Sequence, residues 1–455
     1  MKNHIGMQTV PGPRGKAWRD SRRRLRRQTL TELLALRAQY GDMIRLPLFP
    51  RPLMLISHPD GVEYILTKHA DNYRKGKFFR SIIRLQGQGL LTSEGDLWRQ
   101  QRRLLQPLFR SSQLACFGSL MVEEVQALVD AWRRVAQQGK AFNVVGWMHR
   151  LSFRVMARAL LGIAPARLDG IGQQLQGIGE QLFPHLATPV VGSWGLAPTL
   201  QAMRLRRAVA TYNDLVQHLI ICRRQAGIDT SATDLLARLI TACDDQSCPY
   251  LTAQQLRDEV ITFIGAGVET SALVLSWTCY LLARHPKVAR LVKDEVDTVV
   301  GARAPLPTDL PRLVYGRMVL DEVMRLYPPA ALLPRQANAD DEIGGYTVPR
   351  HAVVLMSQYV THRHPDFWPD PERFCPERFS LGRRSGQHRF AYFPFGEGPR
   401  ICIGKPFALM EMHLALTTIA QTYRLDLVQN HPVVPYLATT LQPRGGLWMT
   451  VTPYS

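Results

Sequence analysis

One apolar stretch, residues 260–283, limits what this chain can fold into more than any other feature. It is long enough to cross a bilayer as a helix. Glu269 lies near its middle, followed by two hydroxyl residues, and Gly265 and Gly267 reduce its hydrophobicity. A charged residue near the centre of a bilayer is costly and rare. The stretch therefore predicts a buried helix that crosses the core of a large soluble protein.

The rest of the chain predicts a mainly helical body with a small β region. Apolar residues follow helical spacing through most of the chain up to Val300. Two short runs, 41–46 and 53–57, are separated by prolines and predict strands of a small sheet, and 344–349 with 353–357 predict a hairpin. No repeat or linker divides the chain. We expect a basic N-terminal arm, 1–28, and a single domain, 29–455.

The arm carries much of the basic character of the chain, which has a formal net charge of +19. Eight arginines and lysines lie between residues 14 and 27, but interleaved aromatic residues and a binding motif are missing, so we expect no nucleic-acid partner. The preferred interpretation is a solvated helix face. Attraction to anionic lipid and a mitochondrial transit peptide are the alternatives. The run Pro11-Gly12-Pro13 argues against a continuous amphipathic helix.

The seven cysteines form no C-x-x-C pair, and their odd number and irregular spacing argue against disulfides or a structural zinc site. This pattern predicts a reducing compartment. No apolar segment of about 20 residues precedes the body, so we expect no transmembrane anchor. The expectation is a cytoplasmic monomer.

Cys402 lies in the decapeptide FGEGPRICIG, which begins at Phe395 and ends at Gly404. Phe395 can pack beside the sulfur and exclude water. Gly398 and Gly404 can adopt backbone angles closed to other residues, so that the loop can lie against a flat ring. A lone cysteine in such a loop would usually be structural, since free cysteine is among the most buried residue types. The order of the whole run instead favours a thiolate bound to heme iron.

One residue on each side of the cysteine supports this interpretation. Arg400 is placed to form a charge-assisted hydrogen bond to a heme propionate. Pro406 predicts the first turn of a helix, which puts Cys402 at a helix N-terminus. The positive end of the helix dipole stabilises a thiolate there.

The decapeptide resembles the pattern Phe-x-x-Gly-x-Arg-x-Cys-x-Gly of the cytochromes P-450, the heme-thiolate monooxygenases, and every fixed position is filled. The resemblance implies the cytochrome P-450 fold, with heme b (iron protoporphyrin IX) between a long distal helix and the Cys402 loop. It implies an oxidoreductase that uses O2 to hydroxylate or epoxidise a lipophilic substrate. The motifs do not indicate whether the substrate is a fatty acid, a terpenoid or a carotenoid.

The segment 266–271 resembles the family's Ala/Gly-Gly-x-Asp/Glu-Thr-Thr/Ser on the distal helix. Ala266 and Gly267 are small enough to let the backbone approach the porphyrin. Thr270 can bond back to the carbonyl of Ala266 and loosen the helix locally. Glu269 and Thr270 would form the proton-delivery pair. An ordinary Glu-Thr on a solvent face is the alternative, and the apolar context argues against it.

Other positions resemble the family's propionate ligands. Trp98 and Arg102 are four residues apart on one predicted helical face and match Trp-x-x-x-Arg. Without Cys402, a surface cation–π pair would be the better interpretation. Arg335 follows the apolar run 330–333, which resembles the segment that lines the substrate cavity.

A predicted scaffold network involves Glu322 and Arg325, which match the family's Glu-x-x-Arg. The resemblance adds Arg378 from Phe-x-Pro-Glu-Arg-Phe, although Arg373 lies in a second copy of Pro-Glu-Arg-Phe and stays an alternative. A buried acid with two guanidiniums must be paired to be tolerable. The network would fix the loop that carries Cys402.

The electrons must come from a separate protein, because no Gly-x-Gly-x-x-Gly fingerprint follows Gly404. We expect a ferredoxin or flavodoxin, steered to a basic face beneath the heme. A heme-thiolate peroxygenase or isomerase, or a non-catalytic heme sensor or lipid-binding protein, are the alternatives, against which the intact Glu269-Thr270 pair argues. The residues expected on the basic face are Arg99, Arg102, Arg103, Arg110, Arg400 and Lys405.

Overall fold

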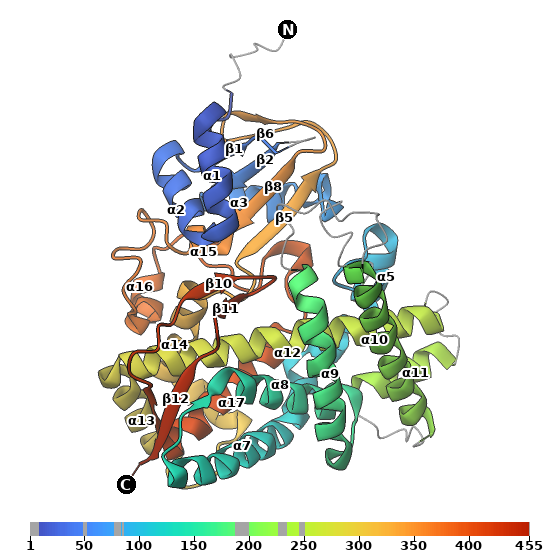
Figure 1. Ribbon diagram of the computed structural model, residues 1–455, viewed down its shortest axis with the longest axis vertical. Helices are drawn as coiled ribbons and strands as arrows, with labels where there is room; N and C mark the ends of the chain where they lie inside the picture. Colours follow the sequence, from blue (N-terminus) through green and yellow to red (C-terminus); the bar gives the residue numbers. More distant parts are fainter. Residues whose placement is uncertain are drawn as a thin grey trace. The chain divides into compact units, whose positions relative to one another are not determined.

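The computed structural model describes residues 9–48, 52–76, 83, 86–186, 200–225, 234–244 and 251–454. The first eight residues of the basic arm and Cys248 lie outside these ranges. The chain divides into two compact units, each made of two segments (Figure 1). Unit 1 comprises Met1–Arg80 and Asp321–Cys402, and unit 2 comprises Ser81–Leu320 and Ile403–Ser455.

Unit 1 is built on a five-stranded sheet with the strand order β1-β2-β8-β5-β3. β2 runs parallel to β8, and the other neighbouring pairs are antiparallel. The two proline-separated runs predicted as strands form β1 and β2. The strands are β1 (Met43–Leu46), β2 (Leu53–Ile56), β3 (Tyr73–Arg74), β5 (Leu332–Ala337) and β8 (Val353–Ser357).

Both faces of this sheet are buried. All four residues of β2 are apolar and buried, and their side chains alternate between the faces, as the pleat of a strand requires. Met54 and Ile56 pack into a cluster with residues of α3 and η1, whereas Leu55 packs with Leu25 of α1 and Leu33 of α2. The covering elements are α1 (Gly15–Arg27), α2 (Thr29–Tyr40), α3 (Pro59–Glu63) and the π-helical turn η1 (Tyr64–Lys68).

The basic arm contains the amphipathic helix α1. Leu25 of this helix is buried and Trp18 packs against the same apolar cluster, while the cationic side chains are exposed. Residues 9–14, which include Pro11-Gly12-Pro13, are not helical, so among the described residues the helix of the arm begins only after the prolines. The carbonyl of Pro11 instead accepts the backbone N–H of Arg45, at 2.7 Å.

The predicted hairpin of 344–349 with 353–357 is wrong in its pairing. β7 pairs with β6, and the two-residue turn between them is Gly344-Gly345, with φ of 57° and 82°. Two successive residues with positive φ suit the tight turn of a hairpin. Residues 353–357 form β8 of the larger sheet. Unit 1 further contains β6 (Asp341–Ile343), β7 (Tyr346–Val348), α15 (Gln358–Thr361) and α16 (Leu381–Arg384), with the short helical turns η2 (Ala70–Asn72), η7 (Pro376–Phe379), η8 (Arg389–Ala391) and η9 (Gly398–Arg400).

The predicted core helix is α12 (Ala253–Arg284) in unit 2. Thr252 caps it, since its side chain accepts the backbone N–H of Gln255. Among the described residues, α12 alone is long and apolar enough to cross a membrane by length and composition, and 67% of its most apolar 18-residue window is buried inside the protein. Such burial is typical of the central helix of a protein core.

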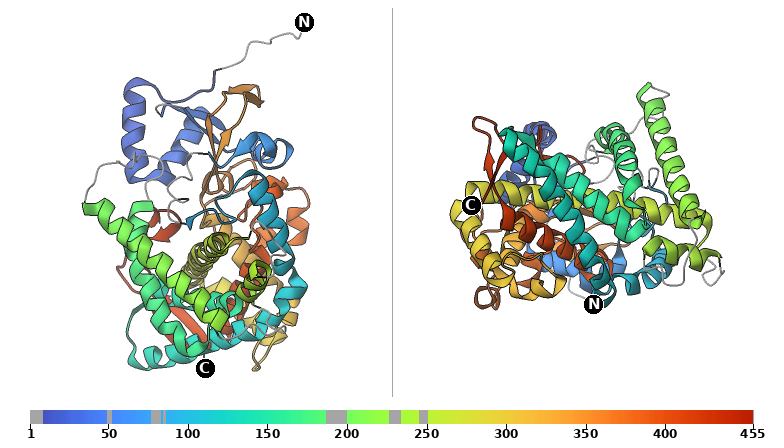
Figure 2. Two further views of the ribbon diagram at one scale, coloured as in Figure 1. Left: turned by 90° about the vertical axis from the view of Figure 1, so that its right-hand side faces the viewer. Right: turned by 90° about the horizontal axis from the view of Figure 1, so that it is seen from below.

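In unit 2, α8 lies alongside α12, and α10, α11, α13 and α17 also contact this helix (Figure 2). Two small sheets, β4-β12-β9 and β10-β11, complete the unit. α14 begins in unit 2 and ends in unit 1. The helices are α5 (Gly95–Leu105), α6 (Ser111–Leu114), α7 (Gly118–Gln138), α8 (Val144–Leu161), α9 (Pro165–Leu186), α10 (Leu200–Gln225), α11 (Leu235–Asp244), α13 (Pro286–Val299), α14 (Val314–Leu326) and α17 (Lys405–Thr422); the short turns are η4 (Gln106–Phe109), η5 (Ala115–Phe117) and η6 (Pro307–Arg312); the strands are β4 (Phe142–Asn143), β9 (Tyr423–Leu427), β10 (Pro435–Leu437), β11 (Leu441–Pro443) and β12 (Trp448–Pro453).

The apolar core around the sheet of unit 1 can be tested by substitution. Leu55 is fully buried, so Leu55→Ala removes apolar burial and leaves a cavity, which we expect to lower the free energy of unfolding by about 2–5 kcal/mol. Leu381→Ala is the matched control in the same unit, because Leu381 is 94% exposed and should change stability by less than about 0.5 kcal/mol. Urea unfolding of both variants measures the difference. Equal stabilities would contradict the assigned core.

Candidate functional site

The loop that ends at Cys402 is closed by backbone hydrogen bonds. The N–H of Cys402 donates to the carbonyl of Phe395 at 2.9 Å, and the N–H of Ile401 donates to the carbonyl of Gly398 at 3.1 Å. Gly398 has a φ of 73°, and a Cβ at this position would collide with the carbonyl oxygen of Leu66. Glycine is therefore needed here both for its backbone angle and for its lack of a side chain. The loop presents an exposed cysteine at its end.

The chain passes from this loop into a helix, as the proline at 406 predicts. α17 begins at Lys405, and Gly404 is its N-cap, whose carbonyl accepts the N–H of Ala408 at 2.9 Å. Cys402 thus precedes the first helical residue by three positions. The free N–H groups at a helix start favour a negative charge nearby, such as a thiolate.

Two arginines of unit 1 that the sequence assigned to propionates differ in burial. Arg335 lies on β5 and is 6% exposed, and its Nη1 donates to the carbonyl of Pro334 at 2.9 Å. Arg400 lies in the short turn η9 and is half-buried, like Phe395. A buried guanidinium is tolerated only with anionic or hydrogen-bonding partners. The chemistry of both arginines suits a carboxylate-bearing group.

The predicted scaffold network is built around a buried ion pair. Arg325 and Glu322 are both inaccessible to solvent, and Arg325 Nε and Nη2 donate to the two carboxylate oxygens at 2.6 and 2.8 Å. Arg378 Nε lies 3.4 Å from Glu322 Oε1. Arg373 contributes only its backbone carbonyl, which accepts a hydrogen bond from Arg325. Of the two arginines that the sequence left open, Arg378 has its side chain beside the acid.

The network also reaches the segment that leads to the cysteine loop. Arg325 Nη1 donates to the carbonyl of His362 at 2.9 Å, and His362 Nε2 accepts the N–H of Phe393 at 3.0 Å. Burial and the charge of Arg325 hold the pKa of His362 well below its usual value. A neutral imidazole has the free lone pair that the Phe393 N–H requires. The Glu322–Arg325 pair therefore holds the backbone at Phe393 in place through His362.

In unit 2, the middle of α12 carries the predicted distal residues. Thr270 Oγ1 donates to the carbonyl of Ala266 at 2.8 Å, a back-bond that competes with the regular helix ladder. A Cβ on Gly267 would meet only Met156, at 3.6 Å. The helix therefore has small residues and a locally weakened ladder at one place. Both features leave room for a group against the helix.

Glu269, beside Thr270, is held by a residue that sequence reasoning missed. Its Oε1 accepts a hydrogen bond from the Thr440 hydroxyl at 2.6 Å. Burial raises the pKa of Glu269, while the Thr440 hydrogen bond and the nearby His149 act in the opposite direction. Thr440 is 171 residues away in the sequence, and nothing in its neighbourhood marks it.

A second acid in unit 2 was also missed. Glu411 lies on α17, is 1% exposed, and burial raises its pKa to about 7, an effect that the hydroxyls of Ser152 and Ser271 oppose. Ser271 follows Thr270 in the chain. The signal that could have found Glu411 is a single carboxyl in an otherwise apolar stretch of helix.

Helix α5 carries Trp98 and Arg102, which are both half-buried. Their spacing of four residues puts them on one face of the helix. Arg102 Nε donates to Gln106 Oε1 at 3.3 Å. Arg99 of the same helix is paired with Asp96 at 2.6 Å, so its charge is partly neutralised.

The donors in the two units suit heme. Unit 1 carries an exposed thiol and two arginines, which suit iron and propionates, and unit 2 carries a helix with glycine, alcohol and acid together with an indole and a guanidinium on α5. Thiolate ligation of heme iron favours cleavage of the O–O bond. The residues present therefore fit this cofactor.

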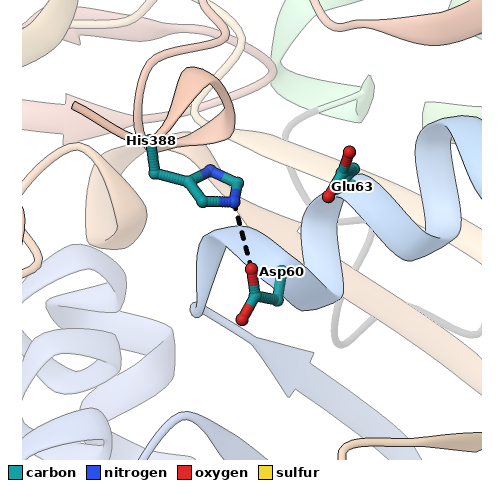
Figure 3. A group of neighbouring side chains, drawn as sticks. All are labelled: Asp60, Glu63 and His388. Atoms are coloured by element: carbon teal, nitrogen blue, oxygen red, sulfur yellow. Dashed lines mark ion pairs between the residues drawn. The ribbon is translucent and has the colours of Figure 1, made fainter. Parts of the chain in front are cut away.

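One other group of described side chains has the composition of a metal site, namely Asp60, Glu63 and His388 (Figure 3). His388 Nε2 lies 3.0 Å from Asp60, but its Nδ1 accepts the N–H of Phe390. A neutral imidazole has a single N–H, which must then be on Nε2 and point at the carboxylate, with no lone pair left for a metal. Lys68 also pairs with Glu63 at 2.9 Å. The contacts of this cluster are therefore a histidine–carboxylate hydrogen bond and a lysine–glutamate ion pair.

Comparison with known proteins gives consistent matches along the chain. A sequence model of the cytochrome P450 family matches residues 19–450. The chain is 33% identical to cyclooctatin synthase of Streptomyces melanosporofaciens, over 100% of this chain and 98% of that protein. It is 35% identical to cyclooctat-9-en-7-ol 5-monooxygenase of the same species, over 87% and 84%. Among solved structures, the cytochrome P450DA heme domain matches with a TM-score of 0.88 and 26% identity, over 99% and 98%.

The duplicated Pro-Glu-Arg-Phe tetrapeptide allows a matched test of the scaffold network. Arg378→Ala removes the ion pair to buried Glu322 and hydrogen bonds to the carbonyls of Pro369 and Asp370. We expect a loss of about 2–3 kcal/mol in the free energy of unfolding. Arg373→Ala, in the other copy, should change stability by less than about 0.5 kcal/mol because Arg373 is exposed.

Guanidinium unfolding of the two variants measures this difference. A larger loss in Arg373→Ala than in Arg378→Ala would contradict the assignment of Arg378 to the network.

Proposed function

Because the chain belongs to the cytochrome P450 family and is a heme-dependent monooxygenase, we propose that it inserts one atom of O2 into an unsaturated cyclic terpenoid, by hydroxylation or epoxidation. The observation that carries the proposal is the exposed Cys402 at the end of a hydrogen-bonded loop directly before a helix start. A thiol in such a place is available to an iron atom as a thiolate.

In this proposal Cys402 is the iron ligand, and the four propionate-binding residues are Arg335, Arg400, Trp98 and Arg102. Phe395 shields the sulfur from water, and Gly398 and Gly404 let the backbone take the required path. When bound, heme supplies the iron that activates dioxygen. The buried Glu322–Arg325 pair acts only as a scaffold, because its polar atoms are used by protein partners.

Proton delivery is assigned to Glu269 and Thr270. Ala266 and Gly267 have small or no side chains, so they leave space beside the helix. The hydrogen bond from the Thr270 hydroxyl to the carbonyl of Ala266 holds the hydroxyl oxygen next to that carbonyl. A hydroxyl beside a carboxyl can pass a proton in two short steps, from the acid to the alcohol and on to the reacting oxygen. Burial raises the pKa of Glu269, which favours a proton being present on it.

The proposed substrate class draws on the relatives and on the apolar segment ahead of Arg335. One relative is named for cyclooctat-9-en-7-ol, an unsaturated alcohol by its name. Ala331 is buried, and Leu332 and Leu333 are half-buried on β5, so this segment offers hydrocarbon contacts. Apolar pockets with few polar groups are typical of sites for such ligands.

The electrons are proposed to come from a separate ferredoxin or flavodoxin. Arg103 and Arg110, on and after α5, are exposed, and Arg102 is half-buried. Exposed cations accelerate encounter with an acidic partner and make its rate depend on ionic strength. Arg99, which is paired with Asp96, contributes less to this field.

The role of Cys402 is tested by Cys402→Ser in the full chain expressed with heme. Because serine oxygen is a poor substitute for a thiolate, we expect loss of the thiolate-specific absorption of the reduced carbon monoxide complex and loss of product. Cys116→Ser is the matched control, since Cys116 is the other exposed cysteine among the described residues and should leave the spectrum intact. A thiolate spectrum in Cys402→Ser would refute the assignment.

The substrate class is tested by optical titration of the ferric protein with cyclooctat-9-en-7-ol, a long-chain fatty acid and a carotenoid. A bound substrate excludes water from the heme pocket, so we expect the Soret band to move toward the high-spin position with the cyclic terpenoid alcohol alone. A saturable shift with the fatty acid or carotenoid and none with the alcohol would overturn the terpenoid assignment while leaving the monooxygenase function in place.

A further inference from the structure

The Thr440–Glu269 hydrogen bond joins the middle of α12 to the turn between β10 and β11. Its length of 2.6 Å is short within the range of hydroxyl–carboxyl hydrogen bonds. Thr440 is 8% exposed. A buried hydroxyl that is directed at a half-buried acid is a specific contact, because the hydroxyl alone would carry a desolvation cost.

The turn that carries Thr440 is itself fixed. The N–H of Ala438 donates to the carbonyl of Thr440 at 3.0 Å, which closes the turn. Next to it, the carbonyl of Leu441 accepts the indole N–H of Trp277 at 3.0 Å, and Trp277 is fully buried. Trp277 lies about two turns beyond Glu269 on α12. The hairpin is therefore attached to this helix at two points, of which only one involves a titratable group.

The surroundings of Glu269 balance its two protonation states. Burial favours the neutral acid, whereas the Thr440 hydroxyl and the nearby His149 side chain favour the carboxylate. His149, on α8, uses Nδ1 to bond the carbonyl of Val145 at 2.8 Å, so its tautomer is set by the backbone. Among these groups Thr440 is the one that touches the carboxylate through a directed bond and can fix its rotamer.

We propose that Thr440 is a positioning residue for proton delivery, which holds the carboxyl of Glu269, the chain neighbour of Thr270, in one orientation. The inference rests on the proposed function, in which Glu269 and Thr270 pass protons to the reacting oxygen. A freely rotating carboxyl would spend part of its time away from the alcohol, and transfer requires hydrogen-bond distance. The hydroxyl of Thr440 therefore raises the share of electrons that ends in product.

The test uses the heme-loaded full chain with Thr440→Val, which keeps the side-chain volume and removes the donor, and Thr440→Ser, which keeps the donor. The first measurement is the share of reducing equivalents recovered as product and not as hydrogen peroxide. We expect about a tenfold fall in Thr440→Val, below the ~10²–10⁴-fold contribution of a positioned acid or base itself, and recovery in Thr440→Ser.

The second measurement does not depend on turnover. The infrared band of the protonated Glu269 carboxyl, identified by its absence in Glu269→Gln, is followed against pH. A hydrogen bond to the charged form lowers a pKa, so its removal in Thr440→Val should move the loss of this band to higher pH. Thr440→Ser should restore the position. An unchanged titration together with unchanged coupling in Thr440→Val would overturn the inference.

Two further variants separate the possible failures. Trp277→Phe removes the other attachment of the hairpin, so a matching loss of coupling and shift of the Glu269 band in this variant would reduce Thr440 to a structural role. Unaltered coupling and an unshifted Glu269 band in Trp277→Phe support the inference. Normal coupling in Glu269→Gln would refute the proton-delivery role in the proposed function, and the catalytic effect of Thr440 with it. A shifted band with normal coupling in Thr440→Val, while Glu269→Gln is uncoupled, would refute the positioning role alone.

Discussion

The buried ion pair between Glu322 and Arg325 is the interaction on which the rest of unit 1 depends. Both side chains are removed from water, and a charge in that environment is tolerable only if its hydrogen-bonding capacity is filled. Arg325 fills its capacity with the carboxylate and with backbone carbonyls of His362, Pro371 and Arg373. These hydrogen bonds form only when the loops that carry the carbonyls adopt defined positions, although the loops lack regular secondary structure. The Glu322–Arg325 pair therefore also fixes the segment that leads to Cys402.

In unit 2, α12 combines packing with chemistry. Its apolar residues make it the core helix, while a short segment in its middle departs from that role. At this segment Thr270 bonds back to the Ala266 carbonyl, and Glu269 bonds to a hairpin. Glu269 and Thr270 are half-buried, and each has a hydrogen-bond partner, which offsets the cost of removing polar groups from water.

Much of the fold and site could be predicted from the sequence where the decisive residues are neighbours in the chain. The Cys402 loop, the helix after it and the core helix follow from local spacing, since glycine, proline and apolar periodicity act over a few residues. Prediction of strand pairing failed, because the strand at 353–357 could pair with either neighbour. Arg373 and Arg378 lie in identical tetrapeptides, and only the resemblance to the longer family pattern favoured Arg378, which is the arginine beside Glu322. Their different partners depend on where the folded chain puts each copy.

By itself, the sequence determined the chemical class of this protein, because the cysteine loop is a contiguous motif that resembles the cytochrome P450 pattern at every fixed position. Only the tertiary structure decided which arginine stands beside Glu322 and which hydroxyl holds Glu269. Thr440 is 171 residues from that acid, and a single hydroxyl carries no periodicity that could connect them. Such contacts arise because packing brings distant elements together, and they are absent from any local pattern.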